Sequence, residues 1–394
     1  MLPKLSVRQK LALLEHFPNP EDIYYTEAFG HLSGISADAE DALRNKDLTD
    51  AQKVIKSCAD RNIGILTIGD TAYPTRLRNI HEPPLVLYYQ GVLPDFESQP
   101  VIAVVGTRKA SAYGLNNARQ FSVQIAACGG LVISGGAYGV DTMALKGALD
   151  AGQQTVAVLG CGVDVVYPRT NRELFVRIRE NGCLISEYLP GTGPKPWQFP
   201  ERNRILSGLS NGVLVVEAPE KSGALITARN AFEQGRDVYV IPGNIGVASG
   251  AGSNQLLQDY GAAVFSGWDV LKDYAPQYPG VVEQRSVMPP RFRQETPPAM
   301  VAQPVDAPRD FLLPDKKDID NPMRSAYSDL DNGNFQLNDL EKQIVACLDG
   351  TPRPVDEVIA QVGLPAAEVL RAFTKLALKG VVVNHPGRLV SARK

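Results

Sequence analysis

Short apolar, β-branched runs recur through the middle of the chain, separated by segments long enough to form helices. Runs that are hydrophobic at every position predict strands buried on both faces, as in a parallel sheet covered by helices. With right-handed crossovers, this pattern predicts an α/β fold with a doubly wound, mostly parallel, Rossmann-like sheet. The predicted strands are Val101–Val105, Leu131–Ile133, Thr155–Leu159, Cys183–Ile185, Val213–Val216, Val238–Ile241 and Ala262–Phe265.

The first 65 residues have a different, helical pattern. Apolar residues recur at helical spacing in 5–16 and 51–58, and a turn at 31–36 with a glycine and a serine cap precedes a further helix at 37–43. The segment resembles a helix-hairpin-helix or SAM-type module. A helical cap that packs on the core explains the same pattern, so both interpretations stay open.

The last 59 residues regain order after a proline-rich stretch. Helices are predicted at 340–348, 355–362 and 365–379, and the last is capped by Gly380. Two short apolar strands, Val381–Val383 and Arg388–Val390, then flank a Pro-Gly turn. Three helices followed by a β-hairpin predict a winged-helix domain.

Ten prolines between residues 276 and 335 break any regular pattern. A segment of this composition predicts a linker rather than packed structure. The chain is therefore divided into a helical domain (1–65), a Rossmann-like core (66–275), a linker (276–335) and a winged helix (336–394). A length of 394 residues agrees with several domains rather than one hydrophobic core.

Composition excludes several protein classes. The net charge of −3 is not the strongly basic balance of many DNA-binding domains. Acidic residues outnumber basic ones before residue 100, but the two are nearly balanced between 101 and 275, which permits a local basic patch. Five scattered cysteines without a CxxC pair predict neither disulfides nor a zinc site, and with only four histidines no metal or other cofactor is expected.

Nothing near the N-terminus resembles a signal peptide, and no apolar run is long enough for a membrane span. Together with the unpaired cysteines, this predicts a cytoplasmic protein without a membrane partner.

Glycine-containing loops follow four of the predicted strands. In an open parallel sheet, ligands bind at the carboxyl ends of the strands, where glycines admit an anion to backbone N–H groups and helix N-termini favour negative charge. The loops therefore predict a phosphate-bearing ligand, although tight turns alone would also require glycines. The loops are Gly106-Thr107-Arg108, Ser134–Gly139, Gly160-Cys161-Gly162 and Pro242-Gly243-Asn244.

Known catalytic signatures are absent from these loops. The first strand is followed neither by GxGxxG nor by a P-loop, which disfavours an NAD enzyme or an ATPase. No Ser-His-Asp or Cys-His set stands out. Acid–base chemistry would fall to Asp141, Glu187 or Glu217, none of which has an obvious partner. No catalytic residue is therefore predicted.

Basic residues interleaved with aromatic ones lie near the same loops. Phosphates pair with Arg and Lys, and bases stack on aromatic rings for roughly 1–3 kcal/mol each, so this pattern is typical of single-stranded nucleic-acid binding. Each charge taken singly can also be a solvated surface group or part of an internal salt bridge. The cluster Arg202-Asn203-Arg204 can also serve as a structural brace for the crevice. The candidate DNA-binding residues are Arg108, Lys109, Arg169, Arg172, Lys195, Phe199, Arg202, Asn203 and Arg204.

The order and spacing of these motifs resemble the DprA/Smf family of DNA-processing proteins. The resemblance is close over 66–270 and looser over both ends of the chain. A series of this length is far more specific than any one motif. It comprises Gly106-Thr107-Arg108, Ser134–Asp141, GCGVDVVYPRTN (160–171), Leu184–Tyr188, FPERNRILSGLS (199–210), and VLVVEAPEKSGALITA (213–228).

The resemblance implies a protein that binds single-stranded DNA without catalysis, forms homodimers through the core, and helps load a RecA-type recombinase during uptake of foreign DNA. It implies phosphate contacts at Arg108, Arg169, Arg172, Arg202 and Arg204. It also implies a pocket shaped by Gly106, Ser134, Gly135 and Gly139.

Two departures from the family pattern stand out. Gly136 occupies a position that is usually aliphatic, and Leu145 stands where the family usually has a histidine. Leucine removes a polar group near the crevice, which weakens a catalytic interpretation and leaves phosphate binding untouched.

Two other functions compete. The LOG family of nucleotide-processing enzymes has a similar core, but its glycine pair and carboxylate are missing from the nearest equivalent segment, 220–227. The winged helix could instead read duplex DNA, since its last helix carries Arg371, Lys375 and Lys379. An apolar stripe on that helix fits core packing, which favours a protein contact or an auxiliary DNA contact.

Overall fold

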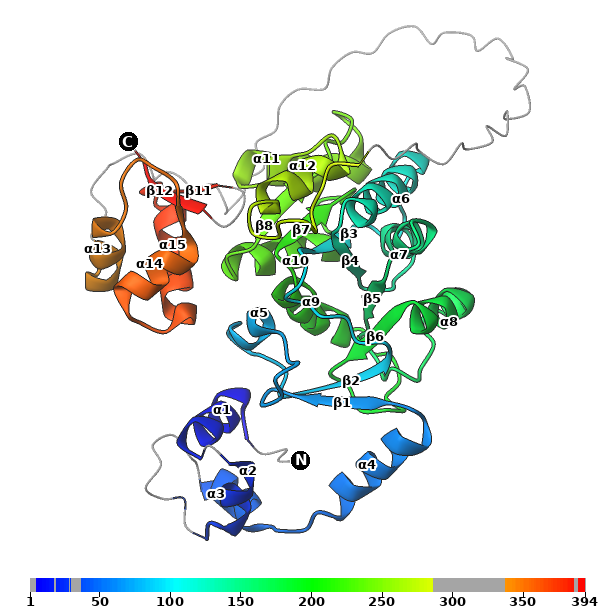
Figure 1. Cartoon of the computed structure of the whole chain (residues 1–394), viewed down its shortest axis with the longest axis vertical. Helices are drawn as coiled ribbons and strands as arrows, with labels where there is room; N and C mark the ends of the chain where they lie inside the picture. The colour runs from blue at the N-terminus through cyan, green and yellow to red at the C-terminus, as the bar shows by residue number, and fades with distance from the viewer. Residues whose placement is uncertain are drawn as a thin grey trace, which may run out of the picture.

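A computed structural model describes residues 5–17, 19–27, 29, 37–285, 337–385 and 389–393. A central sheet with helices on both faces carries the N-terminal helices at one end and a small C-terminal unit beside it (Figure 1). No helix within these described ranges is both long and apolar enough to cross a bilayer.

The central sheet is parallel over most of its width. The strand order is β1-β2-β6-β5-β4-β3-β7-β8-β9, and only the β1–β2 and β2–β6 pairs are antiparallel. The predicted doubly wound α/β fold is confirmed. The strands are β1 (Gly64–Thr67), β2 (Val86–Gly91), β3 (Val101–Val105), β4 (Leu131–Ser134), β5 (Thr155–Val158), β6 (Gly182–Ser186), β7 (Gly212–Val215), β8 (Asp237–Val240) and β9 (Ala262–Ala263).

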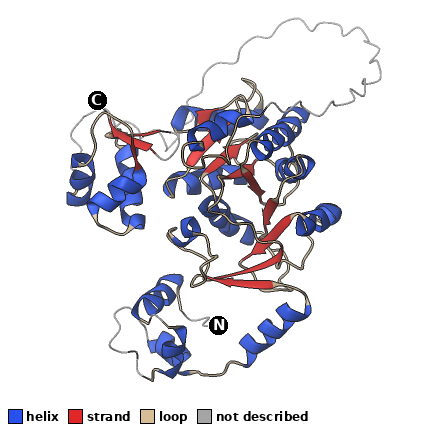
Figure 2. Ribbon diagram, in the orientation of Figure 1, coloured by secondary structure: helices blue, strands red, loops and turns tan. Residues whose placement is uncertain are grey.

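Helices cover both faces of this sheet (Figure 2). Val101, Ala103 and Val105 of β3 pack towards α9 and α10, whereas Ile102 and Val104 pack towards α6 and α7. Every residue of β3 is therefore buried, which explains its unbroken apolar sequence. The helices of this unit are α5 (Thr75–Arg78), α6 (Ala112–Ala127), α7 (Val140–Asp150), η1 (Arg169–Asn171), α8 (Arg172–Glu180), α9 (Gln198–Leu209), α10 (Gly223–Glu233), η2 (Ala248–Gly250), α11 (Ala251–Asp259), α12 (Gly267–Leu271) and η3 (Lys272–Tyr274).

The two edges of the sheet differ from the prediction. The antiparallel strands β1 and β2 were not predicted. Only Leu66 is buried among the four residues of β1, whereas β2 contains an apolar run in which both Leu87 and Tyr88 are buried. At the other edge, β9 has two residues instead of the four predicted, and Phe265 beyond it is 79% exposed.

The N-terminal region contains α1 (Val7–His16), α2 (Pro20–Tyr25), α3 (Ala37–Arg44) and α4 (Thr49–Asp60). Ser6 begins α1 with a capping box, since its hydroxyl accepts from the Gln9 amide and the Gln9 side chain accepts from the Ser6 amide. Cys58 of α4 packs with Tyr88 and Val163, which joins this region to the sheet edge. The predicted turn at 31–36 lies outside the described residues.

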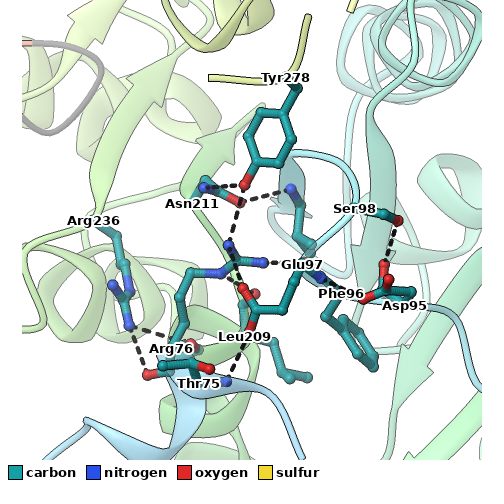
Figure 3. A network of polar contacts seen from close by, with 12 residues as sticks. Thr75, Arg76, Asp95, Phe96, Glu97, Ser98, Leu209, Asn211, Arg236 and Tyr278 are labelled. Atoms are coloured by element: carbon teal, nitrogen blue, oxygen red, sulfur yellow. Dashed lines mark hydrogen bonds and ion pairs between the residues drawn. The ribbon is translucent and has the colours of Figure 1, made fainter. Parts of the chain in front are cut away.

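Residues 276–285, which the sequence placed in the linker, pack against the core. Val282 is buried, and the Tyr278 hydroxyl accepts hydrogen bonds from Arg76 Nη1 and Asn211 Nδ2, each at 3.3 Å (Figure 3). Arg76 also donates to the carbonyls of Phe96 and Leu209. The packed core thus runs ten residues past the expected boundary, and the rest of the predicted linker, 286–335, lies outside the described residues.

The C-terminal unit contains three helices and a three-stranded sheet of order β10-β12-β11. This arrangement is the predicted winged helix, with β10 as an additional short strand; the predicted turn at 386–387 lies outside the described residues. Its elements are α13 (Asp339–Ala346), β10 (Arg353–Pro354), α14 (Val355–Val362), α15 (Ala366–Leu378), β11 (Val382–His385) and β12 (Leu389–Ala392).

Candidate nucleic-acid interface

A crevice of about 420 Å³ opens at the carboxyl ends of β3, β4 and β7, as the positions of the glycine loops predict. The N-terminal parts of α9 and α10 form its walls together with the turn after β3. Six of the predicted site residues line the crevice: Gly106, Arg108, Lys109, Phe199, Arg202 and Asn203.

Two helices of eleven residues each begin beside this crevice. Gly139 is the N-cap of α7, and the Ser222 hydroxyl caps α10 by accepting from the Ala224 amide. The first N–H groups of a helix lack partners inside the helix and carry partial positive charge. Two such ends directed at one crevice favour an anionic ligand.

Gly139 allows α7 to approach the turn after β3. Its φ of +75° is a conformation that other residues rarely adopt. A Cβ at this position would lie 2.5 Å from the carbonyl oxygen of Thr107 and 2.8 Å from that of Arg108. The glycine therefore lets the start of α7 lie against the turn after β3, although Gly139 itself does not line the crevice.

Gly106 and Gly135 also permit close packing. A Cβ on Gly106 would lie 2.5 Å from Val140 Cγ2, and one on Gly135 would lie 2.4 Å from Arg202 Nη2. Ser134 is fully buried and its hydroxyl donates to the Val104 carbonyl at 2.7 Å. That hydroxyl joins β3 to β4, so Ser134 shapes the pocket without facing a ligand.

Arg108 and Phe199 form the exposed basic and aromatic part of the crevice. The Arg108 Cζ lies 5.1 Å from the centre of the Phe199 ring, and the Tyr167 ring centre lies 5.5 Å from the same point. A guanidinium above an aromatic ring is attracted by the ring's quadrupole while keeping its N–H donors free to turn outward. The pair therefore presents a positive charge and aromatic surface together.

Arg202 differs from the prediction, because it is only 4% exposed. Its Nη1 donates to the carbonyls of Gly135 and Val158, and its Nε donates to Asn203 Oδ1. Arg202 also neighbours Asp141, whose pKa is raised by burial and lowered in part by Arg202. A buried arginine that bridges the ends of β4 and β5 forms the floor of the crevice rather than an exposed phosphate contact.

Asn203 lines the crevice, whereas Arg204 does not. The Asn203 Nδ2 donates to the Gly223 carbonyl at 3.2 Å and ties α9 to the start of α10. The Arg204 Nη2 lies 2.8 Å and 2.9 Å from the two Glu187 carboxylate oxygens, outside the crevice. The structure therefore does not bring Arg204 together with Arg108.

Three further predicted residues lie exposed near the crevice without lining it. Arg169 begins η1 and Arg172 begins α8, both just after Tyr167. Lys195 places its Nζ 5.9 Å from the centre of the Trp197 ring, which is itself 52% exposed. Exposed positive charge and aromatic surface therefore continue beyond the residues that line the crevice.

The three carboxylates considered for acid–base chemistry all have structural partners. Glu187 pairs with Arg204, and Asp141 neighbours Arg202. Glu217 is buried, and its Oε2 accepts from the Ser111 amide at 2.9 Å and from the Ser111 hydroxyl at 3.0 Å. Of the three, Asp141 lines the crevice, whereas Glu187 and Glu217 do not.

Comparison with known proteins identifies the family to which this chain belongs. The sequence profile of DNA recombination-mediator protein A matches residues 64–275, and that of the DprA winged helix domain matches residues 331–388. The chain belongs to the DprA/Smf family. It is 31% identical over 392 residues to protein Smf of Synechocystis, which covers 95% of this chain and 92% of that protein.

Solved structures of DprA proteins have the same fold. DNA processing protein A of Streptococcus pneumoniae superposes with a TM-score of 0.61 at 35% identity, over 68% of this chain and 93% of that one. DNA processing protein A of Helicobacter pylori gives a TM-score of 0.50 at 27% identity, over 55% of this chain and 97% of that one. The structure of that protein was determined to describe its mode of single-stranded DNA binding.

Both departures from the DprA/Smf pattern lie beneath the crevice. Leu145 is fully buried in an apolar cluster with Leu159 and Phe175 and does not line the crevice. A Cβ on Gly136 would lie 3.1 Å from Phe175 Cζ, and its φ is +68°. Leucine at 145 therefore adds to the core where a histidine would need a polar partner.

Sequence reasoning missed the wall opposite Arg108. Lys221, Ser222 and Thr227, at and after the end of β7, line the crevice, and Lys221 is exposed. The sequence analysis used this segment as part of the family resemblance and in the comparison with nucleotide-processing enzymes, but assigned none of its residues to the site. The position of Lys221 after a buried parallel strand is the signal that could have identified it in this DprA/Smf protein.

Proposed function

We propose that this chain binds single-stranded DNA in the crevice between α7, α9 and α10, without catalysis. The observation that carries the proposal is the exposed Arg108 guanidinium held over Phe199, at a crevice that two helix N-termini also face. Arg108, Lys109 and Lys221 would neutralise phosphates, while Phe199 and Tyr167 would offer aromatic surface to bases. The single-stranded DNA binding named for the Helicobacter pylori relative supports this proposal.

The finer role is inferred from the resemblance to the family. We infer that the bound strand is passed to a RecA-type recombinase, in natural transformation or another recombination pathway, by a homodimer formed through the core. We place this activity in the cytoplasm, and the five cysteines, all free, agree with a reducing compartment. Sedimentation of the protein alone tests the dimer, and recombinase filament formation on coated single strands tests the loading.

Fluorescence anisotropy of a labelled oligonucleotide tests DNA binding. Single strands should bind more tightly than duplex, with little dependence on base sequence. Affinity should fall with salt, with a slope of about −0.7 for each phosphate neutralised. Arg108→Ala should weaken binding and make that slope shallower by about 0.7.

Lys146→Ala is the matched control, because it removes one exposed positive charge from α7 away from the crevice. It should leave both affinity and slope unchanged. Equal effects of the two variants, or affinity that does not change with salt, would contradict a DNA site at Arg108.

The nucleotide-processing alternative is less well supported. Family membership does not favour it, and the carboxylates at the crevice are held by Arg202 and Ser111. Release of free base from nucleoside monophosphates, measured by chromatography, would support the nucleotide-processing alternative instead.

A further inference from the structure

A second cavity, of about 380 Å³, lies between the core and the winged helix. The core side is formed by the loop after α5, by Arg204 of α9 and by the last turn of α10; the winged-helix side is formed by α15. Since α15 is the second helix of the helix-turn-helix made with α14, it is the element that would enter a DNA major groove.

One contact seats α15 on the core. Gly235, directly after α10, has a φ of +69°, and a Cβ there would lie 2.7 Å from Leu370 Cδ2. The leucine methyl group therefore rests where only glycine leaves room for it. Leu370 is 7% exposed, and α15 lies against α10 at this point.

Charge complements this apolar contact. α10 ends in Glu233 and has no basic residue in its last turn. The partial negative charge at the C-terminus of this helix is therefore not offset by a positive side chain of α10 itself. Arg371 and Lys375, four residues apart on one face of α15, line the same cavity as Glu233 and Glu82. The core side also contributes His81 and Arg204, and Arg204 is neutralised by Glu187.

We propose that α15 is docked on the C-terminal end of α10 in an autoinhibited state, so that the winged helix engages duplex DNA only after it leaves the core. Arg371 and Lys375 line this cavity opposite the core, and a space of about 380 Å³ is far too small to admit a DNA duplex whose major groove is about 12 Å wide, so the core blocks a duplex from this face of α15. Small interfaces between domains of one chain are reversible, which suits a switch.

The docking is separate from the single-strand crevice. Asn230, Glu233 and Gln234 at the end of α10 line this cavity, whereas Ala224 and Thr227 near its start line the crevice. The inference therefore goes beyond the proposed single-strand function and does not depend on it.

The test uses the full chain carrying Glu233→Arg, which replaces attraction with repulsion while leaving the winged helix unaltered. Without DNA, amide hydrogen exchange at residues 230–236 and along α15 should become faster, and the radius of gyration should increase. Affinity for a duplex oligonucleotide should rise about fivefold, because a larger fraction of molecules is competent to bind. Glu180→Arg, the same charge change on exposed α8, should alter none of these readouts.

A charge swap separates release from local damage to α10. Adding Arg371→Glu to Glu233→Arg restores opposite charges across the cavity, so slow exchange and the compact radius should return. Equal behaviour of Glu233→Arg and Glu180→Arg, or failure of the swap to restore slow exchange, would overturn the proposal. Because exchange and radius are measured without DNA, these results stand even if the chain binds no single strands.

Discussion

The Nη1 of Arg202 donates a 2.7 Å hydrogen bond to the carbonyl oxygen of Gly135. This bond joins α9 to the end of β4 and keeps the guanidinium inside the protein, beside Asp141. An arginine that looks like a phosphate ligand in the sequence is thus part of the scaffold that holds the crevice open.

Arg202→Glu should therefore destabilise the core rather than simply weaken DNA binding. The change places a second carboxylate next to Asp141 and leaves two carbonyl groups without their donor. Breaking a buried charge pair costs about 3–5 kcal/mol, so the thermal midpoint should fall by about 10 °C. Circular dichroism during heating measures this midpoint.

Arg108→Glu serves as the control for Arg202→Glu, because it makes the same charge change at an exposed position. Its midpoint should stay close to that of the unaltered protein while DNA affinity drops. A stable Arg202→Glu protein with weak DNA binding would show instead that Arg202 contacts phosphate.

Gly139→Ala should destabilise the protein by more than the strain of a positive φ. Conformation alone costs about 1 kcal/mol, and here the new Cβ would also meet the Thr107 and Arg108 carbonyl oxygens. Gly152→Ala isolates the first effect, since Gly152 has a φ of +71° and no atom within 4 Å of the new Cβ. Urea unfolding of both variants gives the difference, and equal losses would contradict the close contact at the crevice.

A protein shortened to end at residue 275 should be less stable than one ending at 285. The shorter chain loses buried Val282 and the Tyr278 hydroxyl that accepts from Arg76 and Asn211 (Figure 3). The lost burial of Val282 and the lost hydrogen bonds to Tyr278 amount to about 3 kcal/mol. Thermal midpoints that coincide would place residues 276–285 in the linker after all.

The winged helix should lose stability at acidic pH through Glu341. A hydrogen bond from Lys379 lowers the pKa of Glu341, whose carboxylate lies 2.7 Å from the lysine Nζ. A carboxyl group with a lowered folded-state pKa stabilises the fold above its unfolded pKa, and this contribution disappears as pH falls through the folded value. Hydrogen exchange along α13 and α15 should therefore become faster as the pH falls from the unfolded pKa of Glu341 through its lower folded pKa.

Glu341→Gln removes the titrating group and should flatten this part of the pH dependence, at the cost of lower stability near neutrality. Asp339→Asn is its control, because Asp339 begins the same helix with an exposed carboxylate. Acid sensitivity that persists unchanged in Glu341→Gln would assign the effect to another group.

Much of the fold was predictable because a buried segment must be apolar, and the pattern of apolar residues is visible in the sequence. The strand Val101–Val105 is buried on both faces, so it must be apolar throughout, and the same holds for its parallel neighbours. The glycines after these strands indicated where the crevice opens. The order of motifs identified the family, which the whole-chain comparison confirmed.

Only the tertiary structure decided what the basic residues do. Arg108, Arg202 and Arg204 have the same side chain, yet one is exposed over Phe199, one is buried beside Asp141, and one pairs with Glu187. Arg202 and Arg204, two residues apart on α9, point in directions about 200° apart, so which of them faces the crevice depends on how α9 is packed. Composition and spacing fix the sheet and the family, whereas the partners of a charge come from segments far away in the chain, which no local pattern records.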